Sequence, residues 1–183
     1  MLENLQAVIL AGGKGTRLGK LGKKVPKAMV DIHGKPFLEI IIEQLKKKGI
    51  KKFLVLTGHK KEIIQNYFKN NNNIEIHKGK TNWTMLTRLL KAKKLIKRKF
   101  LLMYCDNYLT KFNLFKNLNL MKKKKTNIIF SIIEKKSNQS GTILEKINKK
   151  IYYKKNIKSN LAEAGYMLIN KKKFFSHINQ KKK

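Results

Sequence analysis

Acidic residues are scarce in this chain of 183 residues, which has ten of them against 44 lysines and arginines. The formal net charge is therefore +34 at neutral pH. Only two of the acids are aspartates, Asp31 and Asp106. A hard cation held by an aspartate would have to be bound at one of these two positions.

Cysteine and long apolar runs are also nearly absent. The single cysteine, Cys105, cannot form an internal disulfide, which fits a reducing compartment. No run approaches the roughly 18 apolar residues of a membrane span, and no secretory signal opens the sequence. We therefore expect a cytoplasmic protein without a membrane partner.

Arginine is rare among the basic residues, because only Arg17, Arg88 and Arg98 accompany 41 lysines. Proteins that read nucleic acids use arginine heavily, since its planar fork grips phosphates and bases. Abundant lysine, asparagine and isoleucine, as in Asn70–Asn73, indicate a coding bias instead. A field that attracts anionic substrates or RNA is the alternative explanation of the charge.

Apolar runs alternate with helical patterns in the first part of the chain, which predicts strand–helix units and a mostly parallel sheet. The expected strands are 6–10, 52–57, 74–77 and 100–104, and the expected helices are 37–48, 60–68 and 84–97. The pattern then changes to a helix at 112–121, a strand at 127–133, a hairpin of 141–147 with 150–153, a strand at 166–169 and a helix at 171–178. We expect one α/β domain over residues 1–183, with a polar Asn148–Lys149 turn in the hairpin.

A glycine-rich turn follows the first apolar run, from Gly12 to Leu18, and it carries Lys14 and Arg17. Glycines let backbone N–H groups approach a polyphosphate. The spacing excludes a Walker loop, because Leu21 stands where that motif has a hydroxyl, and it misses the dinucleotide fingerprint by one position. A turn that only needs positive φ angles is the alternative.

Asp106 directly follows the continuous apolar run at 100–104. Ligands of open parallel sheets lie beyond the carboxyl ends of the strands, where the glycine-rich turn also emerges. Asp106 is thus placed to hold a cation against phosphates, unless it only starts a turn or caps a helix. Asp31, before Gly34, is interpreted as a turn residue.

Several strings together resemble the sugar-1-phosphate nucleotidyltransferase family, the nucleotide-sugar pyrophosphorylases. They are Gly12-Gly13-x-Gly15-Thr16-Arg17-Leu18, Pro26-Lys27-Ala28-Met29, Gly34-Lys35-Pro36-Phe37-Leu38, the run from Leu101 to Asn107, and Glu163-Ala164-Gly165-Tyr166-Met167. The resemblance covers nearly the whole chain and is most specific near the N-terminus. It implies a Rossmann-like, three-layer fold with a mixed, mostly parallel central sheet.

The resemblance also implies roles for individual residues. Arg17 would grip the β and γ phosphates, Lys27 would neutralise the α-phosphate and the sugar phosphate, and Asp106 would hold the cofactor Mg²⁺. Glu163 and Gly165 would contact the sugar, although Glu163 could equally be an exposed charge. The nucleotide-binding positions would be Leu10, Ala11, Gly12, Gly13, Lys14, Gly15 and Thr16. Lys14 could instead point to solvent.

The activity that the resemblance implies is transfer of a nucleotidyl group from a nucleoside triphosphate to a sugar 1-phosphate. The products would be a nucleotide-sugar, for surface polysaccharide or lipopolysaccharide synthesis, and pyrophosphate. Heptose-1-phosphate guanylyltransferase-like and glucose-1-phosphate cytidylyltransferase-like members are the most similar. Two departures stand out: residues 81–89 lack the family's glycines, and no aspartate follows Asp106. The base and the sugar stay open, and we expect the domain to be incomplete at its C-terminal end.

Two other functions stay open. A basic RNA-binding protein would use the charge and the Tyr152-Tyr153-Lys154-Lys155 string, although we expect no nucleic-acid partner. A nucleotide-binding subunit without catalysis would keep the glycine-rich turn. Homo-oligomers are possible. The histidines lack metal-ligand spacing and are expected in turns and at the surface; they are His33, His59, His77 and His177. Trp83 is expected to pack rather than to stack on a base.

Overall fold

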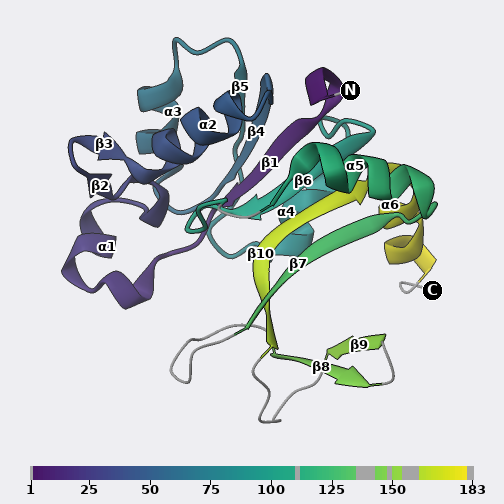
Figure 1. Ribbon diagram of the computed structural model, residues 1–183. Helices are drawn as coiled ribbons and strands as arrows, with labels where there is room; N and C mark the ends of the chain where they lie inside the picture. The colour runs from purple at the N-terminus through teal and green to yellow at the C-terminus, as the bar shows by residue number, and fades with distance from the viewer. Residues whose placement is uncertain (1, 110–111, 135–142, 148–149, 154–160, 181–183) are drawn as a thin grey trace.

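Four parallel strands form one half of the central sheet, in the order β5–β4–β1–β6 (Figure 1). The computed structural model describes residues 2–109, 112–134, 143–147, 150–153 and 161–180. The parallel strands are β1 (Gln6–Ala11), β4 (Lys52–Thr57), β5 (Ile74–His77) and β6 (Lys99–Tyr104). β1 is paired at both edges, with β4 and with β6, and is buried on both faces, which explains its continuous apolar run.

The other half of the sheet is antiparallel. β10 (Leu161–Asn170) pairs with β6 and with β7 (Ile128–Glu134). β10 also contacts β8 (Ile143–Ile147), which pairs with β9 (Lys150–Tyr153). The mixed sheet and the hairpin are therefore confirmed, while the predicted Asn148–Lys149 turn and residues 141–142 lie outside the described residues.

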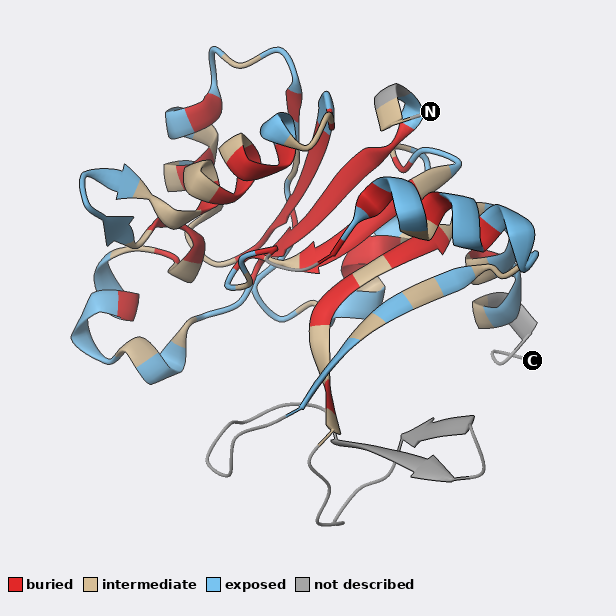
Figure 2. Ribbon diagram, viewed as in Figure 1, coloured by how far each residue is buried: buried red, intermediate tan, exposed pale blue. Residues whose placement is uncertain are grey.

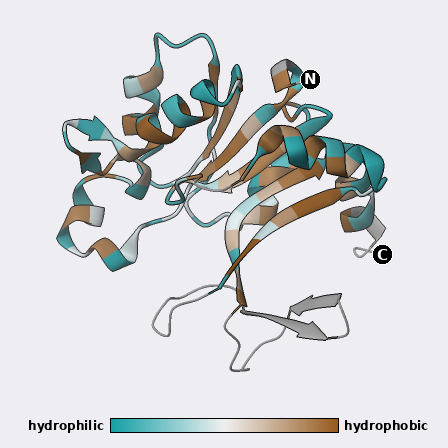
Figure 3. Cartoon of the chain, in the orientation of Figure 1, coloured by the Kyte–Doolittle hydropathy of each residue, from teal (hydrophilic) through white to brown (hydrophobic). Residues whose placement is uncertain are grey.

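Helices cover both faces of the sheet and make three layers. Successive residues of β1 point to opposite faces, so Ala7 and Ile9 join one apolar cluster while Val8 and Leu10 join the other. The first cluster contains α2 (Phe37–Lys47), α3 (Lys61–Phe68) and α5 (Leu114–Lys123), and the second contains α4 (Met85–Lys91) and α6 (Lys171–Gln180). Figure 2 shows the buried strands between these helices, and Figure 3 shows that the same strands are apolar.

Short elements connect β1 to α2. They are 3₁₀ turns at Thr16–Leu18 and Lys27–Met29, the helix α1 (Lys20–Lys24), and the two-residue strands β2 (Asp31–Ile32) and β3 (Lys35–Pro36). The remaining 3₁₀ turn, Leu2–Asn4, precedes β1. The Asp31 carboxylate accepts a hydrogen bond from the Gly34 N–H at 3.0 Å, which confirms its expected place in a turn.

The helix expected over 84–97 is shorter than its apolar pattern suggested, and α4 ends at Lys91. Leu86 of α4 is 42% exposed. Ile96 is buried, although it lies beyond the helix in a turn. The buried Gln6 side chain fixes this turn, since it donates to the Leu95 carbonyl and accepts from the Lys97 N–H. A long-range contact therefore ends the helix.

Among the described residues, no helix combines the length and apolarity needed to cross a bilayer.

Candidate active site

A pocket of about 360 Å³ opens at the carboxyl ends of β1 and β6. It lies where an open parallel sheet places its ligands. Residues of the glycine-rich turn, of the Lys27 turn, of the segment before α4 and of the end of β6 surround it. The lining residues are Leu10, Ala11, Gly12, Gly13, Gly15, Thr16, Arg17, Leu18, Lys27, Ala28, Thr81, Trp83, Met85, Arg88, Tyr104, Cys105 and Asp106.

Within the glycine-rich turn, Gly15 needs to be glycine for two reasons. Gly15 has φ +64°, in the left-handed region that side chains disfavour. A β-carbon on Gly15 would also lie 3.3 Å from the Lys27 side chain, so the two pocket segments pack closely. Gly12 and Gly13 have no positive φ. The explanation by backbone conformation alone therefore applies to Gly15 but not to Gly12 or Gly13.

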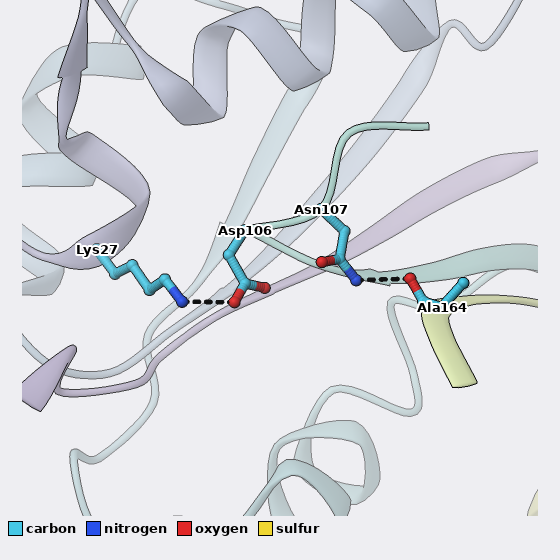
Figure 4. A network of polar contacts seen from close by, with 4 residues as sticks. All are labelled: Lys27, Asp106, Asn107 and Ala164. Atoms are coloured by element: carbon cyan, nitrogen blue, oxygen red, sulfur yellow. Dashed lines mark hydrogen bonds and ion pairs between the residues drawn. The ribbon is translucent and has the colours of Figure 1, made fainter. Parts of the chain in front are cut away.

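Lys27 and Asp106 form an ion pair, with 2.5 Å between the lysine Nζ and an aspartate oxygen (Figure 4). Lys27 begins the short turn that follows Pro26, and Asp106 follows β6. The two side chains remain 32% and 36% exposed, so both can still meet a ligand. The structure thus places Arg17, Lys27 and Asp106 around one pocket.

Glu163 and Gly165 of β10 lie beside this pocket without lining it. The Asn107 side chain donates to the Ala164 carbonyl at 2.8 Å, which ties the Asp106 turn to β10 (Figure 4). Gly165 has φ +80° at an irregular register of the strand, and its N–H donates to the Glu163 carboxylate at 2.7 Å. Burial raises the pKa of Glu163 above its ordinary value of 4.5.

Other predicted residues lie elsewhere. Lys14 is exposed and does not line the pocket, in contrast to its neighbours in the turn. His77 was expected in a turn or at the surface, but it lies half-buried in β5, where burial lowers its pKa. His33 and His177 are exposed, and His59 is half-buried in a turn. No three His, Cys, Asp or Glu residues form a group that could hold a metal within the described ranges.

Four pocket residues were not predicted from the sequence: Arg88, Tyr104, Cys105 and Met85. Arg88 is 4% exposed and donates to the backbone carbonyls of Gly12, Thr57 and Thr81. Its rarity, as one of three arginines, was the available signal. Cys105 is no candidate nucleophile, because burial raises the pKa of its thiol to about 12. Trp83, expected to pack, contributes to the pocket wall and lies 6.3 Å from the His77 ring.

Known proteins resemble this chain in sequence. The family model for nucleotidyl transferases matches residues 6–142. The D-glycero-alpha-D-manno-heptose 1-phosphate guanylyltransferase of Campylobacter jejuni is 52% identical over 65 residues, which are 36% of this chain and 29% of that protein. The glucose-1-phosphate cytidylyltransferase of Salmonella typhimurium is 47% identical over 66 residues, which are 36% of this chain and 26% of that protein. The matched segment thus spans under a third of each curated relative.

The fold also matches solved structures. A putative glucose-1-phosphate thymidylyltransferase from Bacillus anthracis superposes with a TM-score of 0.82 at 18% identity. The match covers 96% of this chain and 74% of that one. The Rossmann-like architecture implied by the sequence is therefore confirmed, and because the family model spans most of the described sheet and pocket, the chain belongs to the nucleotidyl transferase family.

Proposed function

We propose that this protein transfers a nucleotidyl group from a nucleoside triphosphate to a sugar 1-phosphate. One observation carries the proposal: the glycine-rich turn, the cations Arg17 and Lys27 and the carboxylate of Asp106 surround a single pocket at the carboxyl edge of the sheet. An oxygen of the sugar phosphate would attack the α-phosphorus, and the bond from that phosphorus to pyrophosphate would break. The attacking group is already an anion, so no protein nucleophile is required.

The barrier of this reaction comes from bringing anions together in line. Arg17 offers paired donors that suit the departing β and γ phosphates. Lys27 offers a compact charge for the α-phosphate and the incoming sugar phosphate. Gly13 and Gly15 let the chain approach the nucleotide closely. On this proposal the Lys27–Asp106 ion pair opens when substrates bind, because Lys27 then faces phosphate.

Asp106 would hold Mg²⁺ together with the substrate. Within the described ranges it is the only carboxylate that lines the pocket. A single carboxylate fits magnesium, which binds through one or two carboxylates, substrate phosphates and water. When bound, the ion would neutralise phosphate charge and favour departure of pyrophosphate. Glu163, beside the Asp106 turn, is proposed to meet sugar hydroxyls.

The relatives named above suggest which substrates to test first. GTP with a heptose 1-phosphate comes first, and CTP with glucose 1-phosphate comes second. A nucleotide-sugar made in this way would serve surface polysaccharide or lipopolysaccharide synthesis. Residues 81–89, which include the pocket residues Thr81 and Trp83, contain no glycine, so base preference is tested with all triphosphates.

The experiment measures pyrophosphate release with Mg²⁺, each triphosphate and a panel of sugar 1-phosphates. We expect release with one preferred pair and none when magnesium is chelated. The Lys27→Met variant, purified identically, controls for contaminating enzymes. Absence of release with every pair would refute catalysis, and nucleotide binding without release would point to the non-catalytic subunit instead.

A further inference from the structure

Arg88 is a buried cation with an unusual set of partners. Its guanidinium donates to the Gly12 carbonyl at 3.1 Å, to the Thr81 carbonyl at 3.3 Å, and to the Thr57 carbonyl. These carbonyls come from the ends of β1 and β4 and from the segment before α4. Within the described ranges no carboxylate forms an ion pair with Arg88. The charge therefore meets backbone carbonyl oxygens rather than a carboxylate.

Three glycines from three segments surround the same guanidinium. A β-carbon on Gly12 would lie 2.5 Å from its Nε, one on Gly58 would lie 2.6 Å from Nη2, and one on Gly79 would lie 2.6 Å from Nη1. None of the three has a positive φ. Backbone conformation therefore does not require glycine at these positions, whereas space does: a β-carbon would meet the guanidinium at all three, and also the Gly12 carbonyl at Gly58 and the Thr57 carbonyl at Gly79. The chain has a slot built for Arg88.

Arg88 fixes the start of the nucleotide turn together with the His59 N–H, which donates to the same Gly12 carbonyl at 3.3 Å. Gly12 and Gly13 are joined by a trans peptide, so the Gly13 N–H points away from the carbonyl that Arg88 holds. Gly13 lines the pocket, and its N–H forms no hydrogen bond with the described residues. A donor of this kind, held by a buried cation behind it, suits a phosphate.

We propose that Arg88 is a positioning residue that holds the Gly12–Gly13 peptide in its phosphate-binding orientation and adds fixed positive charge behind the pocket. The inference rests on the proposed function, because it assumes a nucleotide in this pocket. It assigns affinity for triphosphate to a side chain whose three hydrogen bonds all go to backbone carbonyls. Loss of Arg88 should therefore weaken nucleotide binding even where the fold survives.

The test is calorimetric titration of the protein with GTP, CTP, UTP and dTTP in the absence of sugar phosphate. The triphosphate that binds the wild-type protein most tightly is then used for all variants. Arg88→Met should raise Kd roughly 10–100-fold, as expected when charge-assisted hydrogen bonds are lost. Arg88→Lys keeps the charge but cannot reach all three carbonyls, so its Kd should lie between. Arg98→Met is the matched control, because Arg98 is exposed beside the amino end of β6.

A second measurement separates positioning from folding. Arg88→Ala leaves a slot shaped for guanidinium, so added guanidinium ion should restore nucleotide affinity at concentrations that do not denature the protein. Gly79→Ala, which crowds the slot from another segment, should weaken binding while Arg88 is still present. It also serves if the Arg88 variants fail to fold.

The outcomes are distinct. A lowered Tm with unchanged Kd in both Arg88→Lys and Gly79→Ala would overturn the proposal and leave Arg88 a structural residue. Failure of the wild-type protein to bind any triphosphate would overturn it together with the proposed function. Binding without pyrophosphate release would end only the proposed catalysis, and the Arg88 comparison would then still decide the inference.

Discussion

At the scale of single residues, Lys27 is the sharpest test of the site. Lys27→Met should lower kcat/KM roughly 10–100-fold, because charge-assisted contacts to phosphate are lost. The Tm should change little, since an ion pair as exposed as Lys27–Asp106 contributes about 0–1 kcal/mol. Initial rates and a thermal melt measure both. Lys46→Met, an exposed change on α2, is the control, and equal losses in the two variants would contradict a specific role.

Glu163 allows a test by pH. Burial raises its pKa in the folded protein, so the ionised carboxylate costs stability once pH rises above the ordinary value of 4.5. Glu163→Gln should therefore raise Tm at pH 7, and the advantage should vanish below pH 4.5, where the carboxyl is protonated in both states. Thermal melts across this range test the sign. A Tm advantage that persists in acid would contradict the burial argument.

The same variant should lose affinity for the sugar phosphate if Glu163 meets sugar hydroxyls. Loss of one hydrogen bond to a charged group predicts a rise in KM of roughly tenfold. A variant that is more stable but binds sugar less well would place Glu163 among residues kept for function at a cost in stability. An unchanged KM would contradict a contact with the sugar and leave Glu163 only its hydrogen bond with the Gly165 N–H.

At the scale of elements, β10 and the turn after β6 are fitted to each other at Gly165. A β-carbon at Gly165 would overlap the Asn107 side chain and lie 2.7 Å from the Tyr104 ring, and φ is +80°. Gly165→Ala should therefore cost about 1–3 kcal/mol of unfolding free energy and lower activity by displacing Asp106. Denaturant unfolding of Gly165→Ala, with and without Asn107→Ala, separates overlap from backbone strain. Full stability of the single variant would contradict the fit.

Elements were predictable where one local signal decided them. The runs at β1, β4 and β6 are continuously apolar because these strands are buried on both faces, and their bounds followed from composition. α4 was overestimated, because the turn that ends it is held by Gln6, some 90 residues away. Sequence periodicity does not record such a contact.

The residues of the site were likewise predictable only where a local signal in the sequence marked them. The glycine-rich turn and Asp106, which line the pocket, were predicted because each directly follows an apolar run, and Lys27 was predicted because its Pro26-Lys27 string resembles the family. Arg88 was missed because its partners are backbone carbonyls, which any residue supplies, in segments far apart in the chain. Its slot becomes visible only when Gly12, Gly58 and Gly79 are seen together.

At the scale of the whole molecule, the charge of +34 remains largely unpaired. Ten acidic residues can pair with only a minority of the 44 lysines and arginines, and the ion pairs between described side chains include Lys27–Asp106 and Lys35–Glu43. An electrostatic field of one sign attracts any polyanion, and salt screens this attraction. The charge can therefore assist the entry of a triphosphate without selecting it. Selection then depends on the short-range contacts in the pocket.

This distinction predicts how RNA should behave. RNA affinity should fall about 10³-fold or more between roughly 50 and 200 mM salt, as for a protein contacting six or more phosphates. Two RNAs of equal length and different sequence should bind alike, because counterion release carries no sequence information. Nucleotide Kd should change far less, since a triphosphate gripped by Arg17 and Lys27 is held at contact distance. Fluorescence anisotropy with both RNAs, beside calorimetry with the nucleotide, measures the contrast. A tenfold preference for one RNA that survives at high salt would favour the RNA-binding interpretation. If the affinities for RNA and for the nucleotide instead fell in parallel with salt, the pocket would be no more selective than the surface.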